Sequence, residues 1–349
     1  MRPAPEISVI TTTYNDVPYL SQAIESILSQ TFTNFEYVII DNGSTDETPQ
    51  MLAEYAAKDI RIVVRRNEKN MGRSLARNWA LELTRGKWVA VFDGDDISHP
   101  ERLEKQIGYL SAHPEVDYMG TGCRPINKQT GESMPDRVID QPLSHGQIYW
   151  KLCFDFPFHH SSTIGRRGLF IEAGGYPPAY PVCEDIFLWM AMAKRGARFG
   201  NIDEELLTYR VNTKPDHYAL NQAVAQQLHR NHVASILKTN VSEAAFSIVW
   251  LTNAEEIYGP APEADSIHSA EAIGILITLY RTLKAQNIFA DEGKLLIQAD
   301  LLGRIRKAMM LTDSVDGRYR PYEYQYAYQY THQYTYQLPV ISTVEGHTG

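Results

Sequence analysis

The first quarter of the chain alternates short apolar runs with amphipathic ones, and this alternation constrains the fold more than any other feature. Short continuous apolar runs are typical of strands buried on both faces, and apolar residues three or four apart are typical of a covering helix. Regular alternation of the two predicts an α/β protein with a parallel sheet and helices on both faces. The predicted elements are strands at 7–10, 37–40, 61–64 and 88–92, and helices at 20–28, 48–57 and 73–84.

A polar cluster directly follows three of these four strands. Thr11–Asn15 follows the first, Asp41–Asp46 the second and Asp93–Asp96 the fourth. The carboxyl ends of parallel strands meet at one edge of a sheet, and open α/β sheets bind their ligands there. We therefore expect all three clusters on one rim, around the binding site.

The acidic cluster suggests a metal site. Asp93, Asp95 and Asp96 are three carboxylates in four positions, and like charges so close are costly unless a cation or water compensates them. Carboxylates shared with substrate phosphates suit Mg²⁺ or Mn²⁺, and Gly94 allows a ligand to approach the backbone closely. A solvated acidic turn before a helix at 100–102 is the alternative, and the position after a strand favours the metal.

The second cluster has two compatible interpretations. The carboxylate of Asp41 can accept the imide N–H of a uracil base. Ser44 and Glu47 have the spacing of a capping box, which predicts that the Ser44 side chain caps the following helix.

Composition argues against nucleic acid as a partner. The chain has 33 basic and 42 acidic residues, a formal net charge of -9 and no basic block. Its three cysteines form no CxxC pair, so we expect reduced thiols in a cytoplasmic protein. No signal peptide is apparent, and the longest apolar run, 273–280, is far shorter than the ~20 residues that cross a bilayer. Any membrane contact is expected to be peripheral, at the inner face.

The pattern changes after residue 215, which predicts three parts. A sheet domain over 1–215 is followed by a helical extension over 216–312 and a Tyr/Gln-rich tail over 313–349. The basic face of Arg304, Arg306 and Lys307 suits either packing, which we favour, or an anionic membrane. The alternating tyrosines of the tail permit a strand, but the composition favours a flexible segment able to form a homo-oligomer.

Four segments in the same order and spacing resemble the motifs of family 2 glycosyltransferases: 8–15, 41–46, 70–78 and 93–96. The resemblance extends over residues 5–215, and four motifs in register are more specific than any one of them. It implies the A-type glycosyltransferase fold, a Rossmann-like mixed sheet flanked by helices. It also implies inverting transfer of a sugar from a nucleotide diphosphate, with UDP expected, in polysaccharide or glycoconjugate synthesis. Thr12 stands where many members have proline, which resembles the spore-coat polysaccharide synthesis-like branch.

The resemblance also implies a role for each matching residue. Asp185, in the Glu-Asp pair at 184–185, would be the general base, Asp95 the ligand of Mn²⁺ or Mg²⁺, and His217 a second ligand. Asp96 and Glu184 would face the donor sugar. The donor nucleotide would be bound by Thr12, Tyr14, Asn15, Asp41, Arg77 and Asp93.

Several of these residues have structural alternatives. Asp185 can be a carboxylate favoured by the dipole of a helix N-terminus, worth about 0.3–1 kcal/mol, and Arg77 can form an ion pair on a helix surface. His159 and His160 are expected to be structural or solvated, and Trp189 to lie in the core rather than on an acceptor sugar.

Two other functions fit the residues less well. A metal-dependent nucleotidyltransferase needs a glycine-rich basic loop near the N-terminus, and Thr11–Asn15 is neither. A non-catalytic sugar-nucleotide-binding protein predicts loss of Asp95 or Asp185, and both are present. The partners expected are therefore a nucleotide-sugar donor and a saccharide, lipid-linked or other hydroxyl acceptor.

Overall fold

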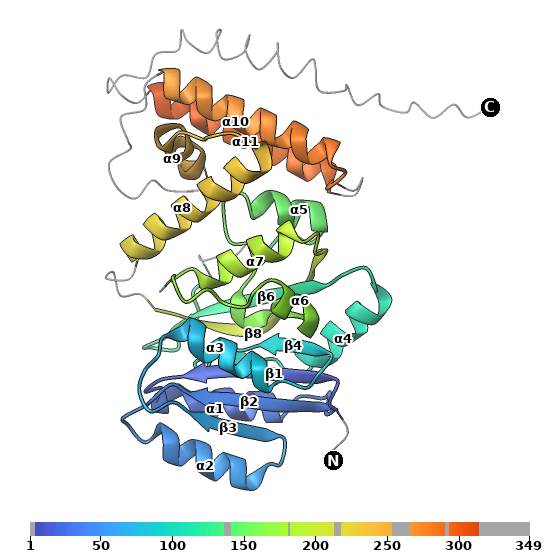
Figure 1. Cartoon of the computed structure of the whole chain (residues 1–349), viewed down its shortest axis with the longest axis vertical. Coiled ribbons are helices and arrows are strands. Elements are labelled where there is room, and N and C mark those ends of the chain that lie inside the picture. The colour runs from blue at the N-terminus through green and yellow to red at the C-terminus, as the bar shows by residue number, and fades with distance from the viewer. Residues whose placement is uncertain are drawn as a thin grey trace, which may run out of the picture. The chain divides into compact units, whose positions relative to one another are not determined.

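The computed structural model describes residues 4–135, 141–180, 182–212, 218–252, 266–289 and 293–313 (Figure 1). The strands are β1 Ile7–Thr13, β2 Phe35–Asp41, β3 Ile62–Arg66, β4 Trp88–Val91, β5 Ile97–Ser98, β6 Tyr118–Asn127, β7 Ile164–Arg166 and β8 Phe199–Val211. The first helices are α1 Val17–Leu28, α2 Thr48–Lys58, α3 Arg73–Leu83, α4 Arg102–Ala112, α5 His145–Lys151, the 3₁₀ turn η1 His160–Ser162, α6 Arg167–Glu172 and α7 Glu184–Lys194. The later helices are α8 Tyr218–Leu237, α9 Glu243–Leu251, α10 Ser266–Ala285 and α11 Lys294–Asp313.

One sheet runs in the order β3-β2-β1-β4-β7-β6-β8-β5. The four predicted strands, β1 to β4, are present and pair in parallel, as expected. Strand β7 is antiparallel to both of its neighbours, while β6 and β8 pair in parallel with each other. The sheet is therefore mixed, with its parallel half built from the N-terminal residues.

Helices cover both faces of the parallel half (Figure 1). Helix α3 lies in front of the sheet in this view and α1 behind it. Side chains of α1, α2 and α4, including Leu20, Leu52 and Leu103, are buried with Val9 and Tyr37 of the strands in one core cluster. The predicted helices α1 and α2 are thus present with their apolar sides on the sheet. The third predicted helix, α3, is also present and buries Ala76, Ala80 and Leu81.

The predicted capping role of Ser44 is wrong. Helix α2 begins at Thr48 without a side-chain cap, and Ser44 Oγ instead accepts the N–H of Asn15 at 3.0 Å. The N–H of Thr48 is satisfied by Asp46 Oδ1 at 3.0 Å. The hydroxyl of Ser44 connects two loops of the rim because its partner comes from the end of β1.

The described residues within Met1–Val241 and Leu279–Ala299 form one compact unit, and those within Ser242–Thr278 and Asp300–Gly349 form another. Helices α8 to α11 occupy the region where the sequence predicted helices. In the second unit, Arg304 is buried and pairs with Asp300 at 2.5 Å, so it serves packing within that unit. The predicted domain limits stay a prediction, and residues 314–349 of the predicted tail lie outside the described part.

Two further expectations concern the chain as a whole. Cys123, Cys153 and Cys183 are all buried, and no two of them form a disulfide. Among the described helices, none has the length and apolar character needed to cross a bilayer.

Candidate active site

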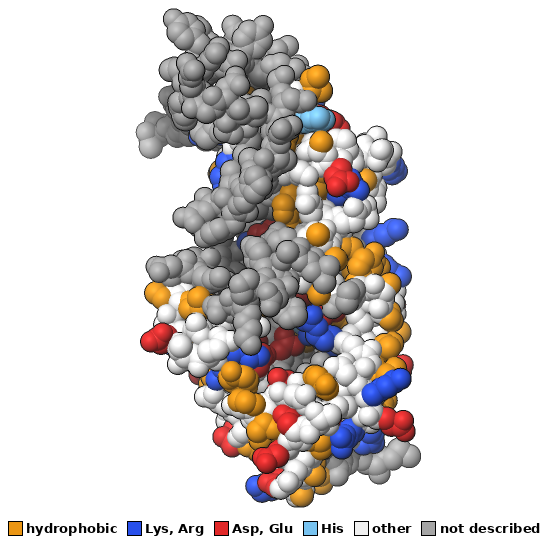
Figure 2. All heavy atoms as spheres, turned by 90° about the vertical axis from the view of Figure 1, so that its left-hand side faces the viewer, with side chains coloured by type: hydrophobic (Ala, Val, Ile, Leu, Met, Phe, Trp, Pro, Cys, Tyr) orange, Lys and Arg blue, Asp and Glu red, His pale blue; other side chains and the backbone are white. Residues whose placement is uncertain are grey.

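The three polar clusters lie on one rim, as predicted. Thr13 and Asp41 are register partners at the ends of β1 and β2. A Cβ placed on Gly94, after β4, would lie 3.6 Å from the Cβ of Thr13, so the acidic loop adjoins the first cluster. Figure 2, which faces the left-hand side of Figure 1, shows acidic and basic side chains gathered around a hollow in the surface.

The loops of the rim are tied to one another by amide side chains. Asn15 has a positive φ of 55°, and its Oδ1 accepts the N–H of Thr45 at 2.9 Å. Asn42 donates to Asn70 Oδ1 at 3.0 Å and accepts the N–H of Met71 at 3.1 Å. These bonds hold the loops after β1, β2 and β3 in a fixed relation, which a binding rim requires.

The residues expected to contact the nucleotide differ in exposure. Asp41 is 1% exposed, accepts the N–H of Ser44 at 2.8 Å and lies 3.2 Å from the Nε of Arg66. Thr12 is partly buried, whereas Tyr14 is 42% exposed. The structure places them on the rim, and their contacts with a nucleotide stay a prediction.

Arg77 joins the acidic loop to the Glu-Asp pair. Its guanidinium is buried, donates to Asp93 Oδ1 at 2.9 Å and forms an ion pair with Glu184. Burial opposes ionisation of Asp93, but Arg77 and His160 outweigh it and hold the pKa of that carboxyl well below its usual range. Burial of Glu184 is likewise outweighed by Arg77 and Arg73, so its pKa is lowered. Because Arg77 is buried, its ion pairs do not lie on a helix surface, and that alternative is wrong.

A second set of contacts fixes the loop before α7. His160 Nε2 lies 2.9 Å from the hydroxyl of Tyr176, and its Nδ1 lies 3.9 Å from Asp93 Oδ2. The Asn78 amide binds both backbone groups of Tyr176, accepting its N–H at 2.8 Å and donating to its carbonyl at 2.7 Å. His160 is thus a structural residue that also faces the site. The role of Asn78 was missed, although it stands in the third motif.

Asp185 lies in the first turn of α7, next to Glu184. Burial, followed by the charge of Glu184, raises the pKa of the Asp185 carboxyl. A carboxylate with a raised pKa is a better proton acceptor at neutral pH, which is the property that a general base needs. Trp189, one turn further on, is fully buried and donates to the Tyr118 hydroxyl at 2.9 Å, which confirms its predicted place in the core.

The other two carboxylates of the acidic loop are held by the far half of the sheet. Asp95 pairs with Lys128 Nζ at 2.5 Å, and its backbone carbonyl accepts from Arg210 at 2.7 Å. Asp96 is fully buried and accepts the backbone N–H of Arg210 at 2.9 Å. Burial and the charge of Asp95 raise the pKa of the Asp96 carboxyl well above its usual value. Its predicted contact with the donor sugar stays a prediction.

Lys128 and Arg210 were missed at the sequence level. Lys128 directly follows β6, and Arg210 lies near the end of β8, strands that the sequence analysis did not predict. A basic residue at the end of a strand can face an acidic rim, and both Lys128 and Arg210 stand at such positions. This pattern could have been used only if β6 and β8 had been predicted.

The rim can offer a metal one or two carboxylates rather than a full set of protein ligands. Across the residues that the structure describes, no three His, Cys, Asp or Glu side chains gather in a metal-binding group. Asp95 is 25% exposed and already faces a cation, the ammonium of Lys128, so its position suits positive charge. A carboxylate of this kind fits Mg²⁺ or Mn²⁺ shared with substrate phosphates. His217, the predicted second ligand, lies outside the described residues.

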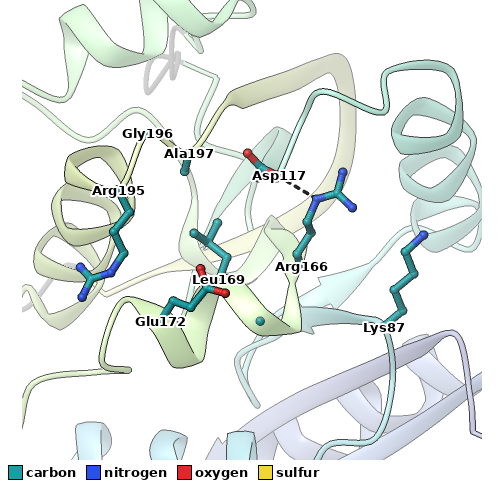
Figure 3. Close-up of a pocket in the computed structure, with 9 residues that line it drawn as sticks. Lys87, Asp117, Arg166, Leu169, Glu172, Arg195, Gly196 and Ala197 are labelled. Carbon is teal, nitrogen blue, oxygen red and sulfur yellow. Dashed lines mark hydrogen bonds and ion pairs between the residues drawn. The ribbon is translucent and has the colours of Figure 1, made fainter.

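A separate hollow of about 370 Å³ lies at the other end of the strands (Figure 3). Lys87 directly precedes β4, and Arg166 is the register partner of Trp88, the first residue of that strand. Arg166 is already paired with Asp117 at 2.8 Å. This hollow is therefore remote from the rim that the motifs form.

Comparisons with known proteins decide the family. The model of "Glycosyl transferase family 2" matches residues 8–172. The O-antigen biosynthesis glycosyltransferase WbnJ of Escherichia coli is 32% identical over 212 residues, covering 60% of this chain and 80% of WbnJ. The chain belongs to glycosyltransferase family 2. It is therefore a glycosyltransferase, and the predicted family is confirmed.

Solved structures of glycosyltransferases share the fold. Residues 1–349 of S. aureus TarS, in complex with UDP-GlcNAc, match with a TM-score of 0.58 and 20% identity, over 90% of this chain and 93% of that one. The mannosyltransferase PcManGT from Pyrobaculum calidifontis, in complex with GDP-Man and Mn²⁺, matches with a TM-score of 0.52 and 21% identity, over 88% of both chains. The A-type glycosyltransferase fold implied by the motifs is thus confirmed.

Proposed function

We propose that this family 2 glycosyltransferase transfers a sugar from a nucleoside diphosphate to an acceptor hydroxyl with inversion, with Asp185 as the general base. The observation that carries the proposal is the position of Arg77 between Asp93 of the acidic loop and Glu184 beside Asp185. Arg77 therefore links Asp93 of the acidic loop, through Glu184, to the neighbouring candidate base Asp185 in one charged network. The raised pKa of Asp185 supports its role.

The donor is proposed to be a UDP-sugar and the cation Mn²⁺ or Mg²⁺. TarS, which shares the fold, was solved with UDP-GlcNAc, and PcManGT with GDP-Man and Mn²⁺. Asp41 on the rim can accept the imide N–H of uracil, and Asp95 presents a partly exposed carboxylate to a cation. The O-antigen function of WbnJ supports a saccharide or lipid-linked acceptor in polysaccharide or glycoconjugate synthesis.

The reaction is a single in-line displacement. An acceptor oxygen forms a bond to the anomeric carbon while the bond from that carbon to the diphosphate oxygen breaks on the opposite face. The acceptor proton passes to Asp185, and such proton transfer typically contributes about 10²–10⁴-fold to the rate. A divalent cation, when bound, supplies positive charge to the departing diphosphate. Arg77 keeps Glu184 and Asp93 ionised, and Glu184 in turn favours the proton-accepting character of Asp185.

The test combines a donor panel with one isosteric substitution. The wild-type protein with Mn²⁺ and a set of sugar nucleotides should release nucleotide with one or a few donors. Asp185→Asn should lower turnover about 100-fold or more while UDP affinity stays within about threefold, because the amide keeps the size of the carboxyl. Asp203→Asn, at an exposed position of β8, is the matched control and should behave as wild type. Undiminished turnover of Asp185→Asn would rule out the base assignment.

A further inference from the structure

The ammonium of Lys128 lies directly against the carboxylate of Asp95. Its Nζ lies 2.5 Å from Asp95 Oδ2, with the two side chains 21% and 25% exposed. Lys128 follows the last residue of β6, and the paired strands β6 and β8 bring both Lys128 and Arg210 to the acidic loop. Two segments remote in sequence therefore converge on Asp95, Lys128 at its carboxylate and Arg210 at its backbone carbonyl.

The surroundings of Lys128 hold its side chain in place. The ammonium lies 4.9 Å from the centroid of the Tyr19 ring, and the Arg210 guanidinium lies 5.2 Å from the same ring. Arg210 also donates to Gln22 Oε1 at 2.6 Å and to the Asp95 carbonyl at 2.7 Å. Cations over an aromatic ring are attracted by its face, so Tyr19 gives both cations a common support. The pair of Lys128 with Asp95 is a built feature rather than a loose surface contact.

We propose that Lys128 is the resident counter-ion of Asp95, and that a divalent cation binds Asp95 only by displacing this ammonium. The inference rests on the proposed role of Asp95 as the metal ligand. A metal on Asp95 Oδ2 competes with the ammonium for the same oxygen, and two cations at such short range repel each other. Lys128 therefore raises the metal concentration that the enzyme needs, and it holds the acidic loop while no metal is bound.

Metal binding by charge variants of Lys128 tests this proposal. In Lys128→Met the Mn²⁺ concentration for half-saturation, followed by electron paramagnetic resonance of free Mn²⁺ with and without UDP, should fall about three- to tenfold. Lys128→Arg keeps the charge and should stay within about twofold of wild type. Lys105→Met is the matched control, because Lys105 pairs with Glu204 at the same 2.5 Å and with Glu101, neither of which belongs to the acidic loop, and its value should be unchanged.

Three results separate the possible failures. An unchanged or increased Mn²⁺ requirement in Lys128→Met, with a melting temperature like that of wild type, would overturn the displacement. Turnover by the wild type that resists EDTA and is lost in Lys128→Met would show that the lysine permanently replaces the metal, so displacement would be wrong while sugar transfer stands. Absence of turnover with every donor would count against the proposed function alone, because the Mn²⁺ titration without UDP still compares the variants.

Discussion

Arg77 stands out among the residues of the site because one side chain neutralises carboxylates from two separate elements. Its guanidinium also lies 5.5 Å from the centroid of the Tyr176 ring. A planar guanidinium can donate in two directions at once and stack on a ring, which a lysine ammonium cannot do in the same way. The identity of this residue is therefore set by geometry as well as by charge.

We expect Arg77→Met to destabilise the protein by about 3–5 kcal/mol, because it leaves the buried carboxylates of Asp93 and Glu184 without their partner. Urea unfolding at neutral pH measures the change. Arg124→Met, at an exposed arginine of β6, provides the control and should change the stability by less than about 0.5 kcal/mol. A loss below about 1 kcal/mol for Arg77→Met would mean that water or other groups already compensate the two carboxylates.

At the level of elements, the loop after β2 passes directly against the loop after β3. Gly43 has φ of 81°, and a Cβ there would lie 2.4 Å from the backbone carbon of Lys69. No L-residue side chain fits without moving one of these loops. Because Asn42 makes the cross-loop bonds next to it, a shift at Gly43 also disturbs the contact of this loop with Asn70 and Met71.

Gly43→Ala should therefore destabilise the protein by about 1–3 kcal/mol and weaken UDP binding, because both the positive φ and the contact with the neighbouring backbone oppose a methyl group. Gly108→Ala in α4 is the contrast, since no atom lies within 4 Å of the added Cβ. It should be neutral or stabilise by about 0.5–1 kcal/mol through helix propensity. Thermal unfolding and UDP calorimetry on both variants give the comparison, and equal behaviour would refute the close-approach argument.

The elements also show what the sequence can reveal. Strands β1, β2 and β4 were predictable because they are buried on both faces, which leaves an apolar run in the sequence. Strand β8 was not, because its middle residues, Asp203 to Glu205, are exposed and polar. The predicted cap at Ser44 was wrong because the Ser44 hydroxyl accepts a hydrogen bond from the backbone N–H of Asn15, 29 residues earlier in the chain. The roles at 184–185 came from family resemblance, since an acidic helix start has a structural explanation by itself.

At the scale of the whole molecule, desolvation lowers the pKa of four histidines, of which His229 and His232 are buried and His145 and His159 partly buried. Against an ordinary value of 6.5, the pKa is about 3 for His229 and about 4 for His145, His159 and His232. The native protein thus keeps them neutral in mild acid, whereas the unfolded chain protonates them below pH 6.5. This difference couples the stability of the fold to pH.

The sign follows from proton uptake by the unfolded state. As the pH falls from about 6.5 towards 4, each of these histidines should remove stability at up to ~1.4 kcal/mol per pH unit. His229→Gln, which does not titrate, should therefore flatten the dependence of the melting temperature on pH. Parallel curves for His229→Gln and wild type between pH 7 and 5 would contradict the assignment.

The ion pair between Arg77 and Glu184 joins residues that are 107 positions apart. During synthesis at about 5–20 residues per second, the carboxylate therefore leaves the ribosome roughly 5–20 s after the arginine that it will meet. Through that interval the nascent N-terminal half can form its parallel strands and still lack half of the charged network. A partly made chain thus carries the donor-side motifs without the proposed base, which is added only when just over half of the chain has been made.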